Sequence, residues 1–182
     1  DYTARMARQA EEDLKDVFRG IEENALLCSA KVLSAFQECR VSTADFIEIT
    51  GYGYSDSGRD KLEEIYAKVF GAEDALVRHN FTCGTHTLAV ALYGMLRPGD
   101  VMLCVTGTPY DTLHSTIGLN GKNMGDGTLL DFGVHYAQVD LTENDQLDYN
   151  AIEEASKDKS VRMVYIQRSR GYSLRHTISV DE

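Results

Sequence analysis

The segment RHNFTCGTHTLAVAL, residues 78–92, holds the residue types in this chain that are best suited to ligand chemistry. Cys83, Gly84, Thr85 and His86 stand between a short apolar run and a stretch typical of a buried helix. Because the first N–H groups of a helix lack intrahelical partners, a turn of small residues there can bind an anion such as phosphate. The same turn also begins many ordinary helices, so an anion site and a simple helix cap both remain open.

Histidines near this turn raise the question of a metal. His86 could donate to a bound phosphate or line the face of a ligand ring, or it could pack inside the first turn of the helix. His79 and His114 show no metal-ligand spacing with carboxylates or cysteines, and a structural zinc site requires such spacing. The sequence therefore predicts no metal.

Composition narrows the class of protein. The chain has 182 residues, of which 43% are hydrophobic and only two are proline, so it should fold around a sizeable core. Its net charge of −11 argues against a nucleic-acid or anionic-membrane surface. No apolar run approaches the ~20 residues of a membrane span, and the charged, amphipathic N-terminus is unlike a secretory signal. The four cysteines lack zinc or disulfide spacing, which favours a cytoplasmic protein with reduced thiols.

The N-terminal part is expected to be helical. Apolar residues recur at helical spacing from Ala4 to about Arg40, with a break expected at Gly20. We assign residues 1–50 to an N-terminal helical arm. A glycine- and tyrosine-rich loop, residues 50–60, follows it, and Asp60 is expected to cap a helix over residues 61–70 that ends at Gly71.

The remainder, residues 51–182, reads as an α/β domain. After the helix at 61–70, short apolar runs alternate with helical patterns, which favours a largely parallel, buried sheet. The expected strands span residues 75–79, 101–105, 134–140 and 161–166, and the expected helices span 84–96, a segment from about 111, and 149–157.

Three segments fall at the carboxyl edge of this predicted sheet, where α/β proteins bind ligands. They are CGTH, the loop TGTPYDT at residues 106–112, and QRSRGY at residues 167–172. Each has an ordinary alternative, since the first could cap a helix, Tyr110 could be a half-buried aromatic, and Arg168 and Arg170 could be a solvated pair. Their convergence on one edge favours a ligand site.

The chain resembles a known family through four segments in order: GYGYSDSGRDKLEEIYAKVFGAEDALVRHNFTCGTH, RPGD, TGTPYDTL and QRSRGY. These resemble the aluminium-resistance protein family, pyridoxal-phosphate-dependent proteins akin to cystathionine and methionine lyases. The resemblance implies fold type I, the aspartate-aminotransferase-like architecture, of which this chain would hold only the N-terminal part of the large domain. It also implies a homodimer or homotetramer with sites at the subunit interfaces.

The resemblance gives the opening motif a role. The cofactor phosphate would bind the backbone N–H groups of Gly84 and Thr85 and the Thr85 hydroxyl, while Cys83 stands where the family has serine and is a weaker donor. Tyr110 matches the aromatic residue that stacks on the pyridine ring. Cys83, Gly84, Thr85, His86 and Tyr110 are thus the candidate cofactor-binding residues of the α/β domain.

A second group of candidates lies in the glycine-rich loop. Tyr52 and Tyr54 fall where related lyases use a tyrosine of the neighbouring subunit to reach the phosphate. Arg59 could belong to the same group, or it could form a salt bridge at the start of a helix.

The resemblance also implies what this chain does not contain. Pyridoxal phosphate chemistry needs a Schiff-base lysine and an acidic residue at the pyridine nitrogen, and in the family both lie beyond the point that matches Glu182. None of the chain's lysines reads as a buried residue with a lowered pKa. They are Lys15, Lys31, Lys61, Lys68, Lys122, Lys157 and Lys159.

Asp1 in place of an initiator methionine, and an end without a helix cap, indicate a fragment, although a processed chain is also possible. The expected function is that of a carbon–sulfur lyase that acts on a small sulfur-containing amino acid by α-proton abstraction and β- or γ-elimination. The 182-residue chain alone is expected to be inactive. The alternatives are a non-catalytic phosphate- or nucleotide-binding α/β module, or an interaction or misfolding-prone fragment.

Overall fold

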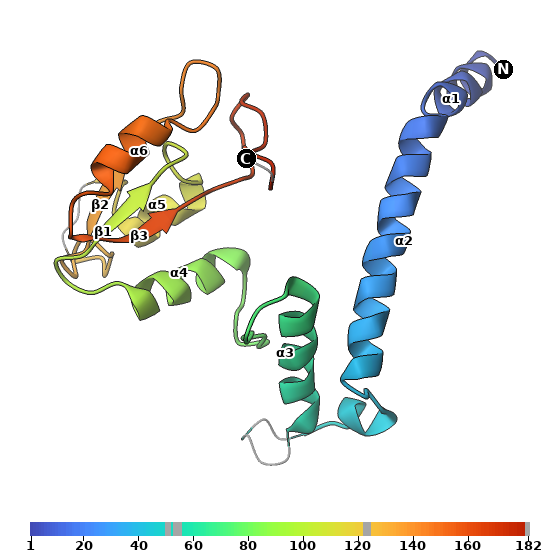
Figure 1. Ribbon diagram of the computed structural model, residues 1–182, viewed down its shortest axis with the longest axis horizontal. Coiled ribbons are helices and arrows are strands. Elements are labelled where there is room, and N and C mark those ends of the chain that lie inside the picture. The colour runs from blue at the N-terminus through green and yellow to red at the C-terminus, as the bar shows by residue number, and fades with distance from the viewer. Residues whose placement is uncertain (50–51, 53–55, 122–124, 181–182) are drawn as a thin grey trace. The chain divides into compact units, whose positions relative to one another are not determined.

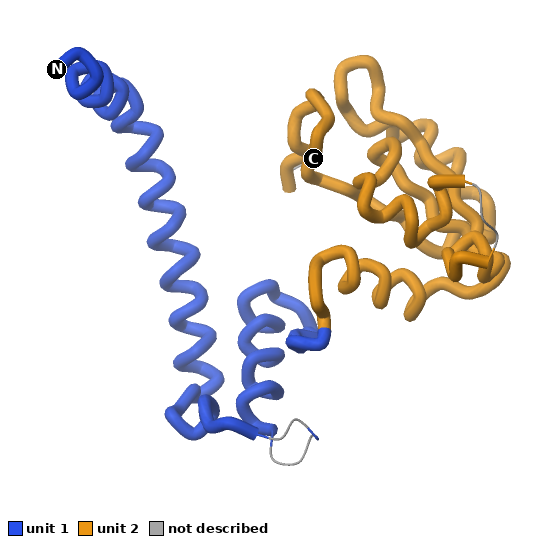
Figure 2. Tube along the Cα trace, turned by 180° about the vertical axis from the view of Figure 1, so that it is seen from behind, with its two compact units in different colours: residues 1–80 blue, residues 81–182 orange. Residues whose placement is uncertain are grey.

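The computed structural model describes residues 1–49, 52, 56–121 and 125–180. The chain divides into two compact units, Asp1–Asn80 and Phe81–Glu182, which Figure 2 colours separately. The first unit is helical and the second contains the sheet. None of the described helices is long and apolar enough to cross a membrane. The division predicted from the sequence, between a helical arm over residues 1–50 and an α/β domain over residues 51–182, stays a prediction.

The first unit contains α1 (Tyr2–Asp13), α2 (Lys15–Glu38), the 3-10 helix η1 (Thr43–Phe46) and α3 (Ser57–Phe70), as Figure 1 shows. The break expected at Gly20 is wrong, because α2 runs through that residue and the break falls at Leu14. A glycine inside a helix costs only about 1 kcal/mol relative to alanine. A helix of 24 residues, such as α2, tolerates that cost.

A small core joins α2 to α3. Ala35 and Cys39 of the α2 end pack against Ile65 of α3, and burial raises the pKa of the Cys39 thiol. The Lys61 ammonium donates to the Cys39 carbonyl oxygen at 2.6 Å, which satisfies one of the last carbonyls of α2. Most apolar side chains of α2 and its N-terminal junction are nevertheless exposed, namely Leu14, Val17, Phe18, Ile21, Leu26, Leu27, Val32 and Leu33.

The start of α3 differs from the prediction and its end agrees with it. Asp56, not Asp60, occupies the N-cap position, so the expected cap was placed one turn too late, and Asp60 lies in the first turn. There its negative charge interacts favourably with the helix dipole. The helix ends at Gly71 in the left-handed conformation, at φ +65°, as expected.

The strand expected at residues 75–79 does not form. The Val77 N–H donates to the Glu63 carboxylate at 2.9 Å, and the Arg78 guanidinium pairs with the same carboxylate at 2.8 Å. The segment therefore bonds to side chains of α3 instead of to a neighbouring strand. The apolar residues of this segment are typical of a strand. A strand also requires a neighbouring strand to which its backbone can bond, and the apolar pattern of one segment does not show whether such a neighbour exists.

The second unit is an α/β structure with a parallel sheet, which confirms the predicted class. Its elements, in chain order, are α4 (Gly84–Met95), β1 (Val101–Cys104), α5 (Asp111–Ile117), β2 (His135–Gln138), α6 (Tyr149–Ala155) and β3 (Val161–Tyr165). The strand order is β2-β1-β3, and both pairings are parallel. The observed elements agree with the predicted ones to within two residues at each predicted end.

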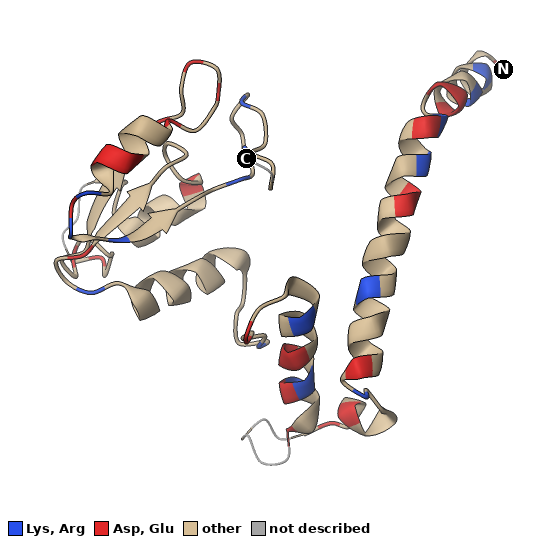
Figure 3. Ribbon diagram, in the orientation of Figure 1, with Lys and Arg blue, Asp and Glu red and all other residues tan. Residues whose placement is uncertain are grey.

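The central strand carries the core of this unit. Met102, Leu103 and Cys104 of β1 are at most 1% exposed. Met102 lies beside Tyr136 and Met163 in the neighbouring strands and belongs to a cluster to which α4 and α5 also contribute. These contributions are Leu92 of α4, Leu96 just after it, and Leu113 and Ile117 of α5. In Figure 3, α4 carries no charged residue, whereas acidic and basic residues mark α2 and α3.

Two helix glycines of the first unit should respond oppositely to alanine. A Cβ at Gly58 would collide with the backbone carbonyl oxygen of Asp45, whereas a Cβ at Gly20 meets nothing within 4 Å. We expect Gly58→Ala to lower the free energy of unfolding by about 1–3 kcal/mol and Gly20→Ala to raise it by about 0.5–1 kcal/mol. Urea unfolding followed by circular dichroism measures both. Equal effects would contradict the close packing of η1 on α3.

Candidate functional site

The turn before α4 is shaped by Cys83. This residue is extended, at φ −165° and ψ 170°, and occupies the N-cap position. Its Sγ accepts a hydrogen bond from the His86 N–H at 3.4 Å, and its carbonyl oxygen accepts from the Thr87 N–H at 3.1 Å. In the part of the chain that the structure describes, the N–H groups of Gly84 and Thr85 have no partner. Two donors at the positive end of α4 are therefore available to an anion.

A threonine of α5 adds to these donors. The Thr85 hydroxyl donates to the Thr112 hydroxyl at 3.2 Å, so the first turns of α4 and α5 meet. The space beside Gly84 is open, because a Cβ built there meets nothing within 4 Å. Thr112 lies in the segment TGTPYDT that the sequence selected, but nothing in its type distinguished it from the neighbouring threonines. Only its hydrogen bond with Thr85 identifies Thr112 as a candidate site residue.

His86 packs against the turn that precedes α4. Its Nδ1 accepts from the Thr82 N–H at 3.3 Å, and its ring lies edge-on to the Phe81 ring, with centroids 6.0 Å apart. The sequence left open whether His86 contacts a ligand or packs against the protein, and in the structure its ring packs against the protein. Since Nδ1 is occupied, Nε2 is the nitrogen with which His86 could also reach a ligand.

Tyr110 ties the loop after β1 to the loop after β3. The Tyr110 N–H donates to the Gln167 amide oxygen at 2.7 Å, and the Gln167 N–H donates to the Thr106 hydroxyl at 3.1 Å. Thr106 and Gln167 were not singled out from the sequence. Their positions just after two apolar strands were the available signal, because the carboxyl ends of parallel strands meet at one edge.

The ring of Tyr110 has an aromatic neighbour. The Tyr172 ring stacks on it, with centroids 5.6 Å apart and planes 26° apart. Interaction with the Tyr172 hydroxyl raises the pKa of Tyr110 above its ordinary value. Tyr110 is therefore a neutral phenol near pH 7 and presents a π face without added charge.

The other predicted residues have varied surroundings. Arg168 is not a simply solvated residue, because its Nε donates to the Ile178 carbonyl oxygen at 3.1 Å. Arg59 forms a salt bridge with Asp56 at 3.0 Å, which confirms the ordinary alternative for that residue. Tyr52 is 83% exposed and belongs to the first unit. Tyr54 lies outside the described residues.

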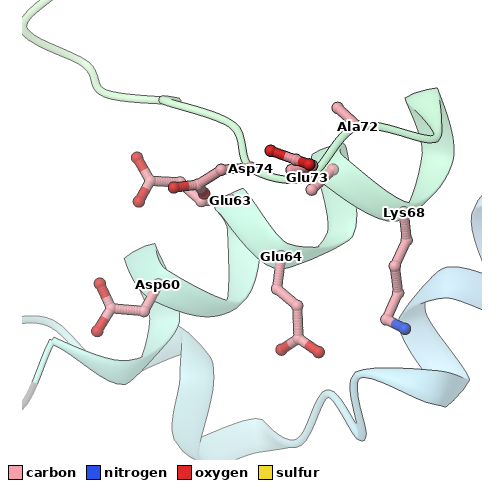
Figure 4. Close-up of a pocket in the computed structure, with 8 residues that line it drawn as sticks. Asp60, Glu63, Glu64, Lys68, Ala72, Glu73 and Asp74 are labelled. Atoms are coloured by element: carbon pink, nitrogen blue, oxygen red, sulfur yellow. The ribbon is translucent and has the colours of Figure 1, made fainter.

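A cavity of about 500 Å³ in the first unit is a poor candidate for an anion site. Its lining is mainly acidic, and Figure 4 shows the carboxylates spread along α3 and the segment after it instead of converging on one point. Glu63, one of them, is already paired with Arg78. Such a surface repels a phosphate. The lining residues are Asp60, Glu63, Glu64, Ala67, Lys68, Ala72, Glu73 and Asp74.

The parallel sheet and the donor-rich turn at its edge agree with the family to which the sequence points. The methionine gamma-lyase family model matches residues 3–182. The chain therefore belongs to the methionine gamma-lyase family.

Individual relatives support this assignment. An uncharacterized protein of Bacillus subtilis, YnbB, is 42% identical over 178 residues, which cover 98% of this chain and 42% of that protein. A carbon–sulfur lyase involved in aluminium resistance from Clostridium novyi is 43% identical, with a TM-score of 0.92 over 100% of this chain and 43% of that one. A candidate cystathionine beta-lyase involved in aluminium resistance from Clostridium acetobutylicum gives 41% identity and a TM-score of 0.92, over 100% of this chain and 43% of that one. The chain thus spans less than half the length of these relatives.

The thiol cap of α4 can be tested by exchange of the His86 amide. Serine is a preferred N-cap residue and its hydroxyl accepts more strongly than a thiol. We expect Cys83→Ser to slow hydrogen exchange in the first turn of α4 and Cys83→Ala to accelerate it, with a difference between them of about 1 kcal/mol. Cys28→Ser, inside α2, is the control and should leave α4 unchanged. Equal exchange in the two Cys83 variants would show that Cys83 does not cap the helix.

Proposed function

We propose that this chain is part of a pyridoxal-phosphate-dependent carbon–sulfur lyase of fold type I that acts on a small sulfur-containing amino acid. Family membership and the names of its structural relatives support the reaction class. The observation that carries the proposal is the set of unpartnered donors where α4 meets α5. We also propose a cytoplasmic location, a reducing compartment in which the four cysteines would remain free thiols.

The residues present fit the phosphate of that cofactor. Two backbone N–H groups, of Gly84 and Thr85, and two hydroxyls, of Thr85 and Thr112, meet beside open space. Hydrogen bonds to a charged group contribute about 1.5–3 kcal/mol each, and the α4 dipole favours the negative charge. Cys83 contributes mainly by capping the helix, and His86 supports the turn and offers Nε2.

Tyr110 supplies the flat surface that a pyridine ring needs. Its backbone is fixed by Gln167 and its ring by Tyr172, so the phenol can hold a stacked ring in one plane. When bound, pyridoxal phosphate withdraws electrons from the bonds at the substrate α-carbon, provided that the bond to be broken aligns with the ring π system. The role of Tyr110 is therefore to orient the plane of the pyridine ring.

Four of the described lysines are poor candidates for the covalent anchor, because each already has a partner. Lys61 donates to the Cys39 carbonyl, Lys68 pairs with Glu38, and Lys15 and Lys157 pair with neighbouring glutamates. We propose that the Schiff-base lysine and the acidic partner of the pyridine nitrogen come from sequence beyond Glu182. Tyr52 and Tyr54 are proposed to approach the phosphate of a neighbouring subunit.

Thr85 should contribute more to cofactor affinity than Cys83. Thr85→Ala removes a hydroxyl that would exchange its hydrogen bond to Thr112 for one to the phosphate, and we expect the Kd of the chain for pyridoxal phosphate to rise about tenfold or more. Cys83→Ala leaves both free N–H groups in place and should have a smaller effect. Absorption titration measures both, and Thr85→Ser, which keeps the hydroxyl, is the matched control. Pyridoxal, which lacks the phosphate, should bind wild type and Thr85→Ala equally.

Two results would contradict this proposal. If wild type does not distinguish pyridoxal phosphate from pyridoxal, the turn before α4 is not a phosphate site. Borohydride reduction and peptide mapping should find no stoichiometric adduct in the 182-residue chain, and an adduct at one of its lysines would overturn the placement of the anchor.

We further propose that the exposed apolar side of α2 serves association into a homodimer or homotetramer. Val17, Phe18 and Ile21, with Leu14 just before α2, share one side of the helix and are 43–58% exposed. Contiguous exposed apolar residues of this kind mark interaction surfaces.

Sedimentation tests this association. We expect the wild-type chain to sediment as an oligomer, and Phe18→Ser with Ile21→Ser to shift it towards the monomer because the apolar area is lost. Glu23→Ser, on the opposite side of α2, is the control, and circular dichroism confirms that the helix persists. A wild-type chain that remains monomeric at micromolar concentration would contradict the proposal.

A further inference from the structure

The loop after β3 touches the ring of Tyr110 at two consecutive residues. Tyr172 stacks on the ring at a centroid distance of 5.6 Å. A Cβ at Gly171 would lie 2.8 Å from Cδ2 and Cε2 of the same ring, and Gly171 also has φ +58°. Both the close approach and the left-handed backbone favour glycine at this position.

The loop that presents these residues is held by its own hydrogen bonds. The Arg175 guanidinium donates to the carbonyl oxygens of Gln167 and Ser169, both at 2.9 Å, and of His176 at 2.8 Å. The backbone N–H of Ile178 also donates to the Arg168 carbonyl oxygen at 3.1 Å. An arginine that binds several carbonyls at once fixes the path of the backbone around it. Gly171 and Tyr172 therefore project from a constrained loop.

The same loop also fixes the backbone of Tyr110. The Gln167 side chain accepts the Tyr110 N–H at 2.7 Å, so residues 167–172 hold both the main chain and the ring of Tyr110. Pre-organisation of this kind lowers the entropy that a side chain loses when a ligand stacks on it.

We propose that Gly171 and Tyr172 form a positioning clamp that fixes the plane of the Tyr110 ring, so that an aromatic, phosphorylated ligand stacks on the face of Tyr110 away from Tyr172. This inference rests on the proposed function and adds two residues to it. Tyr172 stacks on the ring, and Gly171 approaches it so closely that an added Cβ would collide with Cδ2 and Cε2. Tyr172 acts through Tyr110 and is a positioning residue, with no role in a chemical step.

The clamp predicts an effect on ring binding without an effect on phosphate binding. We expect Tyr172→Ala to weaken pyridoxal and pyridoxal phosphate binding to the chain by about two- to tenfold, the range of an aromatic pair, and to change the circular dichroism of the bound ring. Inorganic phosphate should bind as in wild type, because Gly84, Thr85 and Thr112 are untouched. Gly171→Ala should weaken ring binding at least as much.

Two controls separate the clamp from general stability. Tyr172→Phe keeps the stacked ring and should bind like wild type, whereas Leu174→Ala changes a side chain of the same loop that is 97% exposed and should have no effect. The midpoint of thermal unfolding should be equal in the Tyr172 and Leu174 variants, whereas Gly171→Ala should lower it, because the added Cβ is strained at φ +58° and meets the Tyr110 ring.

The outcomes distinguish the clamp from the cofactor site itself. Unchanged or tighter ring binding by both Tyr172→Ala and Gly171→Ala, with wild-type affinity intact, would overturn the clamp alone. Tighter binding would mean that Tyr172 competes for the ligand's face of Tyr110. A wild-type chain that binds neither pyridoxal phosphate nor inorganic phosphate would overturn the proposed function, and the clamp with it.

Discussion

The parallel pairing of β1 with strands on both sides is the constraint on which the rest of the second unit depends. Because β1 is buried on both faces and hydrogen-bonded on both edges, its register fixes where the loops after β1 and β3 emerge. Both loops emerge at one edge, and there Gln167 bonds to Thr106 and Tyr110. The site is therefore a consequence of strand register more than of any single motif, since a slip in register would move its parts to different places.

The candidate site combines two kinds of support. On one side, helix termini supply donors, with Cys83 capping α4 and the hydroxyls of Thr85 and Thr112 joining two first turns. On the other, the loop after β3 supplies a constrained aromatic surface through Tyr110 and Tyr172. The phosphate group and the ring of one ligand make different demands, which are directed charge-assisted hydrogen bonds and a fixed plane. Under the proposed function the two halves would meet these demands separately, so that each could be altered without the other.

The points that the sequence interpretation missed or left open have different physical causes. The run at 75–79 looks like a strand, but its backbone bonds to Glu63 of α3. Gly20 looks like a break, but α2 continues through it, because one glycine costs a helix of 24 residues only about 1 kcal/mol relative to alanine. For His86 the sequence left two uses open, and the Thr82 N–H and the Phe81 ring decide how it packs.

The sequence by itself determined the α/β class, the parallel sheet, the approximate bounds of α4 to β3 and the segments that reach the sheet edge. These features can be predicted because hydrophobic periodicity and the residues that begin and end helices depend only on positions close together in the chain. Only the tertiary structure decided that Thr112 meets Thr85, that Gln167 holds Tyr110 and that Gly171 and Tyr172 cover its ring. These contacts join residues 27 and 57 positions apart in two of the cases. Such pairings depend on the strand order and on the path of the loop after β3, which no local pattern specifies.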